Sequence, residues 1–166
     1  EFFCGLSLDA VAKFGIYQGK EIEEKELEKI LVSELKNRFL QRAMSYISRG
    51  IKTEFQMRRY LKTLSIKKKG SWFENIRDDQ LQEILDEVMN KLKEYDYLDD
   101  EEFASQFISS RIKNKPRGKR VLVSELMSKG INKDLAQGKV DELVEDEYDV
   151  LRRVYEKKYK EERFTI

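Results

Sequence analysis

Apolar residues recur at three- and four-residue intervals through most of this chain, the spacing of an amphipathic α-helix. The longest such run lies between Glu23 and Ser48, and Ser33 is a point at which it could divide into two helices. Similar stripes predict helices over residues 53–66, 79–94, 99–115, 119–129 and 132–145, with another starting after Asp146. Proline and glycine are scarce, with 1 and 8 residues, so composition also favours an all-α protein.

Capping residues mark where these helices begin and end. Ser7 is a predicted N-cap of a short first helix, and Gly15 its stop. Thr53 is followed by Gln56, the arrangement of a capping box. Further along, the predicted signals are an N-cap at Asp99, a stop at Gly130 and an N-cap at Asn132.

Four consecutive carboxylates, residues 99–102, lie between two aromatic clusters in YDYLDDEEFASQF. Such a run could be a metal site, a substrate clamp or the start of a helix. Asp99 suits an N-cap, and acids in a first turn favour the positive end of the helix dipole. The alternating ligands and central glycine of an EF-hand are missing. We therefore interpret the run as structural.

The order of helices and breaks appears twice. Apolar positions correspond at an offset of 65 residues: Met57, Leu61 and Ile66 match Leu122, Leu126 and Ile131. In the second copy, Val121, Leu122 and Leu126 are predicted to point inward. A three-helix unit buries its faces poorly alone, so neighbouring units should stack.

We therefore expect an all-α fold of tandem three-helix repeats stacked into an elongated, curved array. Its divisions would be an N-terminal helical extension (1–37), a first repeat with a long 67–79 loop (38–98), a second repeat (99–145) and the start of a truncated third (146–166). Because the chain starts at Glu1 and its helical pattern runs almost to Ile166, we also expect it to be part of a longer protein.

Composition limits the chemistry. The chain has no histidine, which removes the usual general base and the commonest metal ligand, so neither a cofactor nor a metal is expected. The single cysteine, Cys4, cannot form an internal disulfide, which suits a reducing cytoplasm. It is predicted to be a small buried apolar residue. No apolar stretch approaches the roughly 18 to 20 residues of a membrane span.

The net charge is only +1, but the charges are strongly partitioned along the chain. Residues 110–120 carry six basic residues and no acid, and residues 49–69 carry eight basic residues against one acid, whereas residues 94–102 and 141–149 carry six acids each. Alternating blocks predict one basic and one acidic face. The candidate binding residues are Arg111, Lys113, Lys115, Arg117, Lys119 and Arg120 around the Pro116 break, and Arg49, Lys52, Arg58, Arg59 and Lys62 in the earlier segment.

Each basic segment also has a simpler interpretation as a solvated helix surface or helix end, favoured by the helix dipole. Lys67–Lys69 form a further basic loop, which also contains Trp72 and Phe73. These two aromatic residues could stack on exposed bases, although packing beneath the loop is the preferred interpretation.

Several motifs between residues 92 and 131 resemble the RecX family of bacterial regulators of the RecA recombinase. They are Tyr97-Leu98-Asp99-Asp100, Phe103-Ala104, Arg111, Gly118, Glu125-Leu126 and Lys129-Gly130-Ile131. The segment SLDAVAKFGIYQGKEI is similar to the region before the repeats in longer members. Two features depart from the family pattern: the longer 67–79 link, and a third repeat with only its first helix.

The resemblance implies a non-enzymatic, cytoplasmic and monomeric protein. It would bind in the groove of the RecA–single-stranded DNA filament and suppress ATP hydrolysis, strand exchange and coprotease activity. A second hypothesis is a stand-alone nucleic-acid-binding module whose helix 119–129 enters a groove, although Arg120, Ser124 and Ser128 form a poor base-reading set. An enzyme, the third hypothesis, rests only on carboxylates that already have a capping role.

Overall fold

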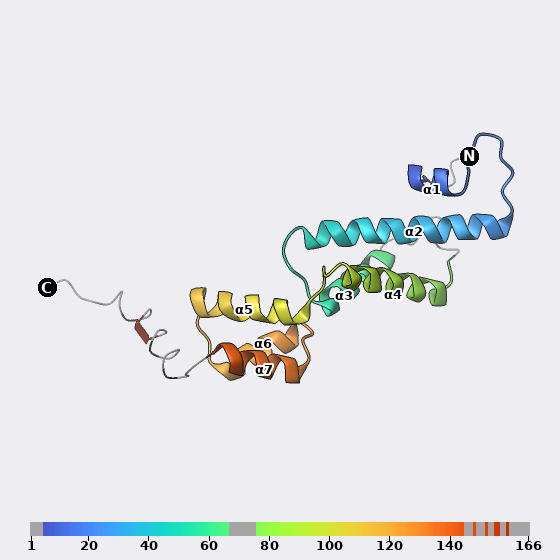
Figure 1. The fold of residues 1–166 in the computed structure, drawn as a ribbon. Coiled ribbons are helices and arrows are strands. Elements are labelled where there is room, and N and C mark those ends of the chain that lie inside the picture. Colours follow the sequence, from blue (N-terminus) through green and yellow to red (C-terminus); the bar gives the residue numbers. More distant parts are fainter. Residues whose placement is uncertain are drawn as a thin grey trace. The chain divides into compact units, whose positions relative to one another are not determined.

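The structure is a computed structural model, which describes residues 5–66 and 76–144 and five isolated residues further on: Tyr148, Arg152, Tyr155, Glu156 and Tyr159. All regular secondary structure in the described part is α-helical, and turns and loops join the helices (Figure 1). The elements are α1 (Leu8–Lys13), α2 (Glu24–Ile47), α3 (Glu54–Ile66), α4 (Asp78–Glu94), α5 (Asp100–Asn114), α6 (Lys119–Ser128) and α7 (Lys133–Leu143). The all-α prediction is confirmed for these residues.

Some predictions concern residues outside the described part. They are the roles of Cys4, of the Lys67–Lys69 loop, and of Trp72 and Phe73. Most of the expected third repeat also lies outside it. No helix in the part that the structure describes combines the length and apolar character needed to cross a membrane.

Contacts divide the chain into two compact units. The first unit comprises residues 1–50 and 57–97, and the second comprises residues 51–56 and 98–166. Helix α2 is continuous from Glu24 to Ile47, so Ser33 does not divide it and no break falls at residue 37. The predicted repeat boundaries at 37, 98 and 145 stay a prediction.

The helix starts are capped as the sequence predicts. The Ser7 side chain accepts a hydrogen bond from the Ala10 N–H, and the Asn132 side chain accepts one from the Asp134 N–H. Thr53 and Gln56 form the reciprocal bonds of a capping box, at 3.2 and 3.1 Å. These bonds satisfy N–H groups that the first turn of a helix leaves without a partner.

The core of the first unit lies between α2 and α4, which run side by side, with α3 packed against them (Figure 1). Tyr46 of α2 stacks on Tyr60 of α3 with ring centroids 4.2 Å apart, so aromatic packing joins these two helices. The buried apolar side chains are Ile30, Leu31, Leu35, Phe39 and Ala43 of α2, Met57 and Leu61 of α3, and Ile84, Leu85, Val88, Met89 and Leu92 of α4.

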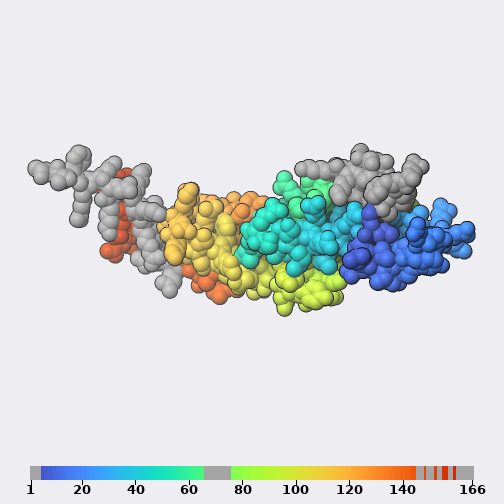
Figure 2. All heavy atoms as spheres, turned by 90° about the horizontal axis from the view of Figure 1, so that it is seen from above, coloured from blue at the N-terminus to red at the C-terminus, as the bar shows by residue number. Residues whose placement is uncertain are grey.

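A buried polar network attaches α1 to this unit. The carboxylate of Glu34, on α2, accepts hydrogen bonds from the Ser7 N–H at 3.1 Å and the Ser7 hydroxyl at 2.8 Å. Arg38 donates to the same carboxylate from its Nε at 3.0 Å, and to the Gly5 carbonyl from Nη2 at 2.5 Å. Figure 2 shows α1, in dark blue, lying on the surface of α2.

The second unit is a bundle of α5, α6 and α7 around one apolar cluster. Its buried members are Phe103, Ala104, Ile108, Leu122, Val123, Leu126, Ile131, Ala136, Val140 and Val144. The prediction that Val121 points inward is wrong, because this side chain is 46% exposed and Val123 takes the inward position. Successive residues of a helix are about 100° apart, so a face centred on Leu122, Val123 and Leu126 leaves Val121 outside it.

Within the second unit, residues 51–56 contact the start of α5 and the turn after α6. The Thr53 hydroxyl donates to the Lys129 carbonyl at 2.7 Å, and the Glu54 N–H donates to Asp100 Oδ1 at 3.0 Å. Phe55 lies against Gly130, whose φ is +91°. A Cβ at Gly130 would lie 2.1 Å from the Phe55 Cβ, so both the turn and the packing require glycine.

Candidate binding surface

The second unit exposes four cations around the break between α5 and α6. We call Lys113, Lys115, Arg117 and Arg120 the α5–α6 cluster. Helix α5 ends at Asn114, Pro116 follows, and Gly118 is the N-cap of α6, so all four cations lie within two residues of the end of α5 or the start of α6. All four are exposed, and none of their side chains has a hydrogen-bond or ion-pair partner among the described residues.

Arg111 and Lys119, predicted to belong to the same surface, are engaged within the unit. The Arg111 Nε lies 2.7 Å from Glu125 Oε2, and its guanidinium lies 4.9 Å from the centre of the Phe107 ring. The ion pair with Glu125 joins Arg111 of α5 to α6. The cation–π contact with Phe107 lies within α5. The Lys119 Nζ lies 3.5 Å from Asp141 Oδ1.

The Lys119–Asp141 contact links the start of α6 to α7. A hydrogen bond from Gln137 and the nearby ammonium of Lys119 together hold the pKa of the Asp141 carboxyl below its usual value. Because both partners are partly exposed, water screens the pair and its effect on folding is small.

The earlier basic segment falls into both units. Lys52 belongs to the second unit, where its Nζ donates to the Ile51 carbonyl at 3.3 Å. In the first unit, the Arg49 Nε donates to the Ser45 carbonyl at 3.2 Å. Lys52 and the other cations of this segment therefore belong to different units.

Helix α3 presents three cations on one exposed face. Arg58 pairs with Asp86 of α4 at 2.5 Å, and this hydrogen bond, with another from Gln82, lowers the pKa of the Asp86 carboxyl. Arg59 and Lys62 are exposed on the same side of α3, opposite Met57 and Leu61. Arg58 therefore has a structural partner, whereas Arg59 and Lys62 extend toward solvent.

The carboxylates 99–102 have internal partners, as a helix start requires. Asp99 Oδ1 accepts hydrogen bonds from the Glu101 and Glu102 N–H groups at 2.8 and 2.9 Å. Asp100 caps the start of α3, Glu101 lies 3.7 Å from Lys139, and Glu102 accepts a bond from Gln106. Among the described residues, no group of three or more acidic or cysteine side chains is arranged to hold a metal ion.

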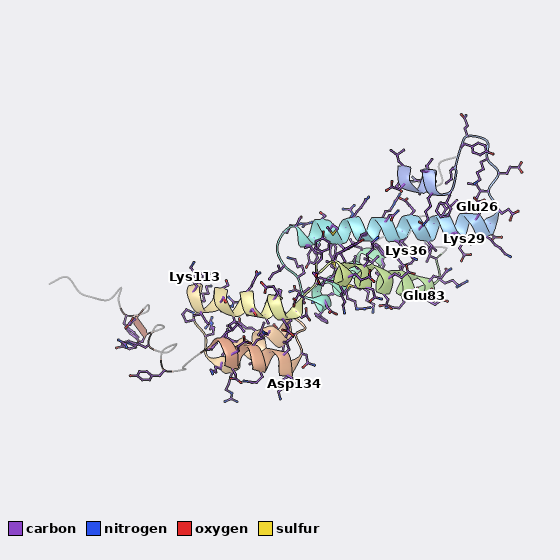
Figure 3. The ribbon with its side chains drawn as sticks, in the orientation of Figure 1. Glu26, Lys29, Lys36, Glu83, Lys113 and Asp134 are labelled. Carbon is purple, nitrogen blue, oxygen red and sulfur yellow. The ribbon has the colours of Figure 1, made fainter. Side chains whose placement is uncertain are left out.

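The described part of the second unit exposes charges of both signs. Figure 3 shows Lys113 at one end of the unit and Asp134 at the opposite end. The carboxylates at the α5 start have hydrogen-bond or ion-pair partners, whereas the four side chains of the α5–α6 cluster have none among the described residues. An exposed cation cluster without counter-charges attracts anions, and phosphate groups in particular, with little dependence on sequence.

The first unit carries a second set of cations, which the sequence alone did not indicate. Lys13, Lys29, Lys36 and Lys91 line a groove between α1, α2 and α4. The available signal was the spacing of Lys29, Ser33 and Lys36, which places them on one face of α2. The contributions of α1 and α4 depend on tertiary packing and have no signal in the sequence.

The fold and this surface define an all-helical protein made of small bundles with exposed cationic side chains. Residues 99–138 match the family model of the second three-helix domain of RecX. Two curated proteins named regulatory protein RecX are similar over about 81% of the chain: 31% identical over 135 residues in Bacillus licheniformis, and 26% over 134 residues in Listeria welshimeri. The chain belongs to the RecX family.

The chain spans about half the length of these curated relatives, covering 46% and 45% of them. Two solved structures have a similar fold. A crystal structure of regulatory protein RecX superposes with a TM-score of 0.69 at 17% identity, over 97% of this chain and 73% of the other. RecX from Lactobacillus salivarius gives a TM-score of 0.52 at 20% identity, over 65% and 61%.

Proposed function

We propose that the protein is a non-enzymatic inhibitor of the RecA recombinase. It binds in the groove of the RecA–single-stranded DNA filament and suppresses ATP hydrolysis, strand exchange and coprotease activity. Membership of the RecX family supports a regulatory role. The resemblance of residues 92–131 to regulators of RecA supports the partner, and we propose that the protein acts as a monomer in the cytoplasm.

The α5–α6 cluster is the observation that carries this proposal. Its four exposed cations lie in the segment that matches the family model, and they have no acidic partner among the described residues. A RecA–DNA filament exposes phosphate groups, which clustered Lys and Arg side chains neutralise. Arg111 has a supporting role here, because it fixes the end of α5 to α6 and so positions the cluster.

The test is the DNA-dependent ATPase of RecA, measured with the wild-type protein and with charge-reversal variants. The triple variant Lys113→Glu, Lys115→Glu, Arg117→Glu should lose inhibition, because it replaces attraction to phosphate by repulsion. Each single reversal should weaken inhibition. Lys133→Glu is the matched control, since Lys133 is exposed in the same unit and lies at the α7 start, with Asp134.

Circular dichroism must show unchanged helix content in these variants. A folded triple variant that inhibits as well as wild type would remove the cluster from the mechanism. Tight, sequence-selective binding of bare duplex DNA without any effect on RecA would instead support a stand-alone nucleic-acid-binding module. The exposed face of α6 offers only Arg120, Ser124 and Ser128 for reading bases, so we expect no such selectivity.

A further inference from the structure

The first unit carries a groove along one face of α2. At one point it opens into a cavity of about 170 Å³ whose lining includes Lys13, Lys36, Asn37, Glu87 and Lys91. A second cavity, of about 480 Å³, shares Lys13, Ser33 and Lys36 with the first. Its lining continues to Phe14, Lys29 and Gln80. The shared residues make the two cavities parts of one groove.

Helix geometry gives this groove a row of cations. Lys29 and Lys36 follow one another along α2 (Figure 3). A rise of 1.5 Å per residue places them about 10 Å apart along the helix axis. Lys13 lies beside this row, with its Nζ 3.4 Å from the Ser33 hydroxyl. Lys91, on the facing helix α4, completes the set.

The groove also contains two acids, Glu28 and Glu87. Glu87 forms an ion pair with Lys36, and Glu28 accepts a hydrogen bond from Gln80 at 2.5 Å. Neither Lys29 nor Lys91 has an ion-pair partner among the described residues. Lys13 has only the Ser33 hydroxyl and the Phe14 ring, 5.4 Å from its Nζ. Four lysines against two acids leave the groove with a net charge of +2, and the Asn37 amide and the Ser33 hydroxyl are additional uncharged donors.

We infer that this groove binds the phosphate backbone of a single nucleic-acid strand. Phosphate oxygens need only side-chain donors and positive charge, which the lysines, Asn37 and Ser33 supply. An acidic extended peptide would gain less, because the walls are helices whose backbone groups are bonded internally and no strand edge is available for pairing. Phe14, half-buried at the side of the groove, adds an aromatic face for a base.

This inference extends beyond the proposed function. It concerns the first unit and a bare strand, and it holds whether or not the protein regulates RecA. It assigns to α1, α2 and α4 a binding role separate from that of the α5–α6 cluster.

The experiment measures binding of fluorescein-labelled oligo(dT) to the whole chain across a series of salt concentrations. In the triple variant Lys13→Gln, Lys29→Gln, Lys91→Gln, the slope of log affinity against log salt should fall by about 0.7 for each lysine that contacts a phosphate. The double variant Lys29→Gln, Lys91→Gln leaves α1 unchanged and should show the corresponding smaller loss. Arg42→Gln is the matched control, because Arg42 is an exposed cation on the opposite face of α2.

Three outcomes would overturn the inference. One is an absence of wild-type binding at low salt, and another is an unchanged slope in both variants. The third is stronger competition by poly-glutamate than by unlabelled oligo(dT), which would assign the groove to an acidic protein segment. The oligo(dT) assay contains no RecA. A variant that loses inhibition of the RecA ATPase but still binds oligo(dT), or one that loses oligo(dT) binding but still inhibits, separates this site from the proposed function.

Discussion

In each unit of this protein, a carboxylate accepts a hydrogen bond from a backbone N–H in a distant part of the chain. In the first unit, Glu34 accepts the Ser7 N–H, and in the second, Asp100 accepts the Glu54 N–H, at 3.1 and 3.0 Å. The surroundings differ. Glu34 is only 3% exposed and has Arg38 as an ionic partner, whereas Asp100 is half-buried beside the Phe55–Gly130 contact.

This difference indicates how each attachment responds to mutation. The first attachment is a buried ionic network, so it depends on the charge of Glu34. The second combines hydrogen bonds with close packing, so it depends on the shape of the turn at Gly130. Two carboxylates that both accept a backbone N–H therefore differ in how they respond to mutation, because their surroundings differ.

Gly130→Ala should cause the largest loss in the free energy of unfolding. The new methyl group would overlap the Phe55 side chain, and φ at this position is +91°, a conformation that alanine adopts only with strain. We expect a loss of about 2–4 kcal/mol in the free energy of unfolding, measured by urea denaturation. Gly15→Ala is a control with positive φ but open space around it, and should cost less. Equal losses would show that packing against Phe55 is unimportant.

The next effect concerns the ionic attachment and its pH dependence. Burial alone raises the pKa of Glu34, but hydrogen bonds from Ser7 and Arg38, with the Arg38 charge, outweigh it and hold the pKa below its ordinary value of 4.5. The stabilisation is therefore complete above about pH 4.5 and is lost as the pH falls through the lowered pKa.

Glu34→Gln should cost about 1–3 kcal/mol at neutral pH, because it removes the charge to which Ser7 and Arg38 donate their hydrogen bonds. Thermal unfolding of wild type and variant should converge as the pH falls below 4.5. A constant difference between the two proteins at all pH values would show that the Glu34 charge has no part in the attachment.

The smallest effect should follow Asp100→Asn. The amide oxygen can still accept the Glu54 N–H, so we expect a change within about 0.5 kcal/mol. Asp100→Ala removes the acceptor and should cost about 1 kcal/mol, as loss of a helix cap does. Chemical denaturation of both variants sharpens the comparison with Glu34. If Asp100→Asn were as damaging as Asp100→Ala, the charge of Asp100, and not only its acceptor oxygen, would hold the second attachment.

Local signals in the sequence determined the helices and their starts. Thr53, Asp99 and Asn132 accept their capping bonds from N–H groups within three residues of their own positions, so no tertiary information is needed to recognise them as caps. The prediction for Val121 failed for a related reason. Apolar character alone does not determine the direction of a side chain in a short helix, because the bundle sets which face turns inward.

The candidate surface was only partly predictable. A basic run in the sequence does not show which cations have a partner elsewhere, and it grouped Arg111 and Lys119 with residues that remain exposed. Their partners, Glu125 and Asp141, lie 14 and 22 residues away. The groove of the first unit was missed because its lysines come from three helices that meet only after folding.

The amino-acid sequence alone determined that the chain is helical, where most helices begin, and that it resembles the RecX family, because these properties reside in short segments. Only the tertiary structure decided that Asp100 caps α3, that Glu34 anchors α1, and which cations remain open to a ligand. Those properties depend on pairs of residues far apart in the chain, and their energies arise only when packing brings the two partners together.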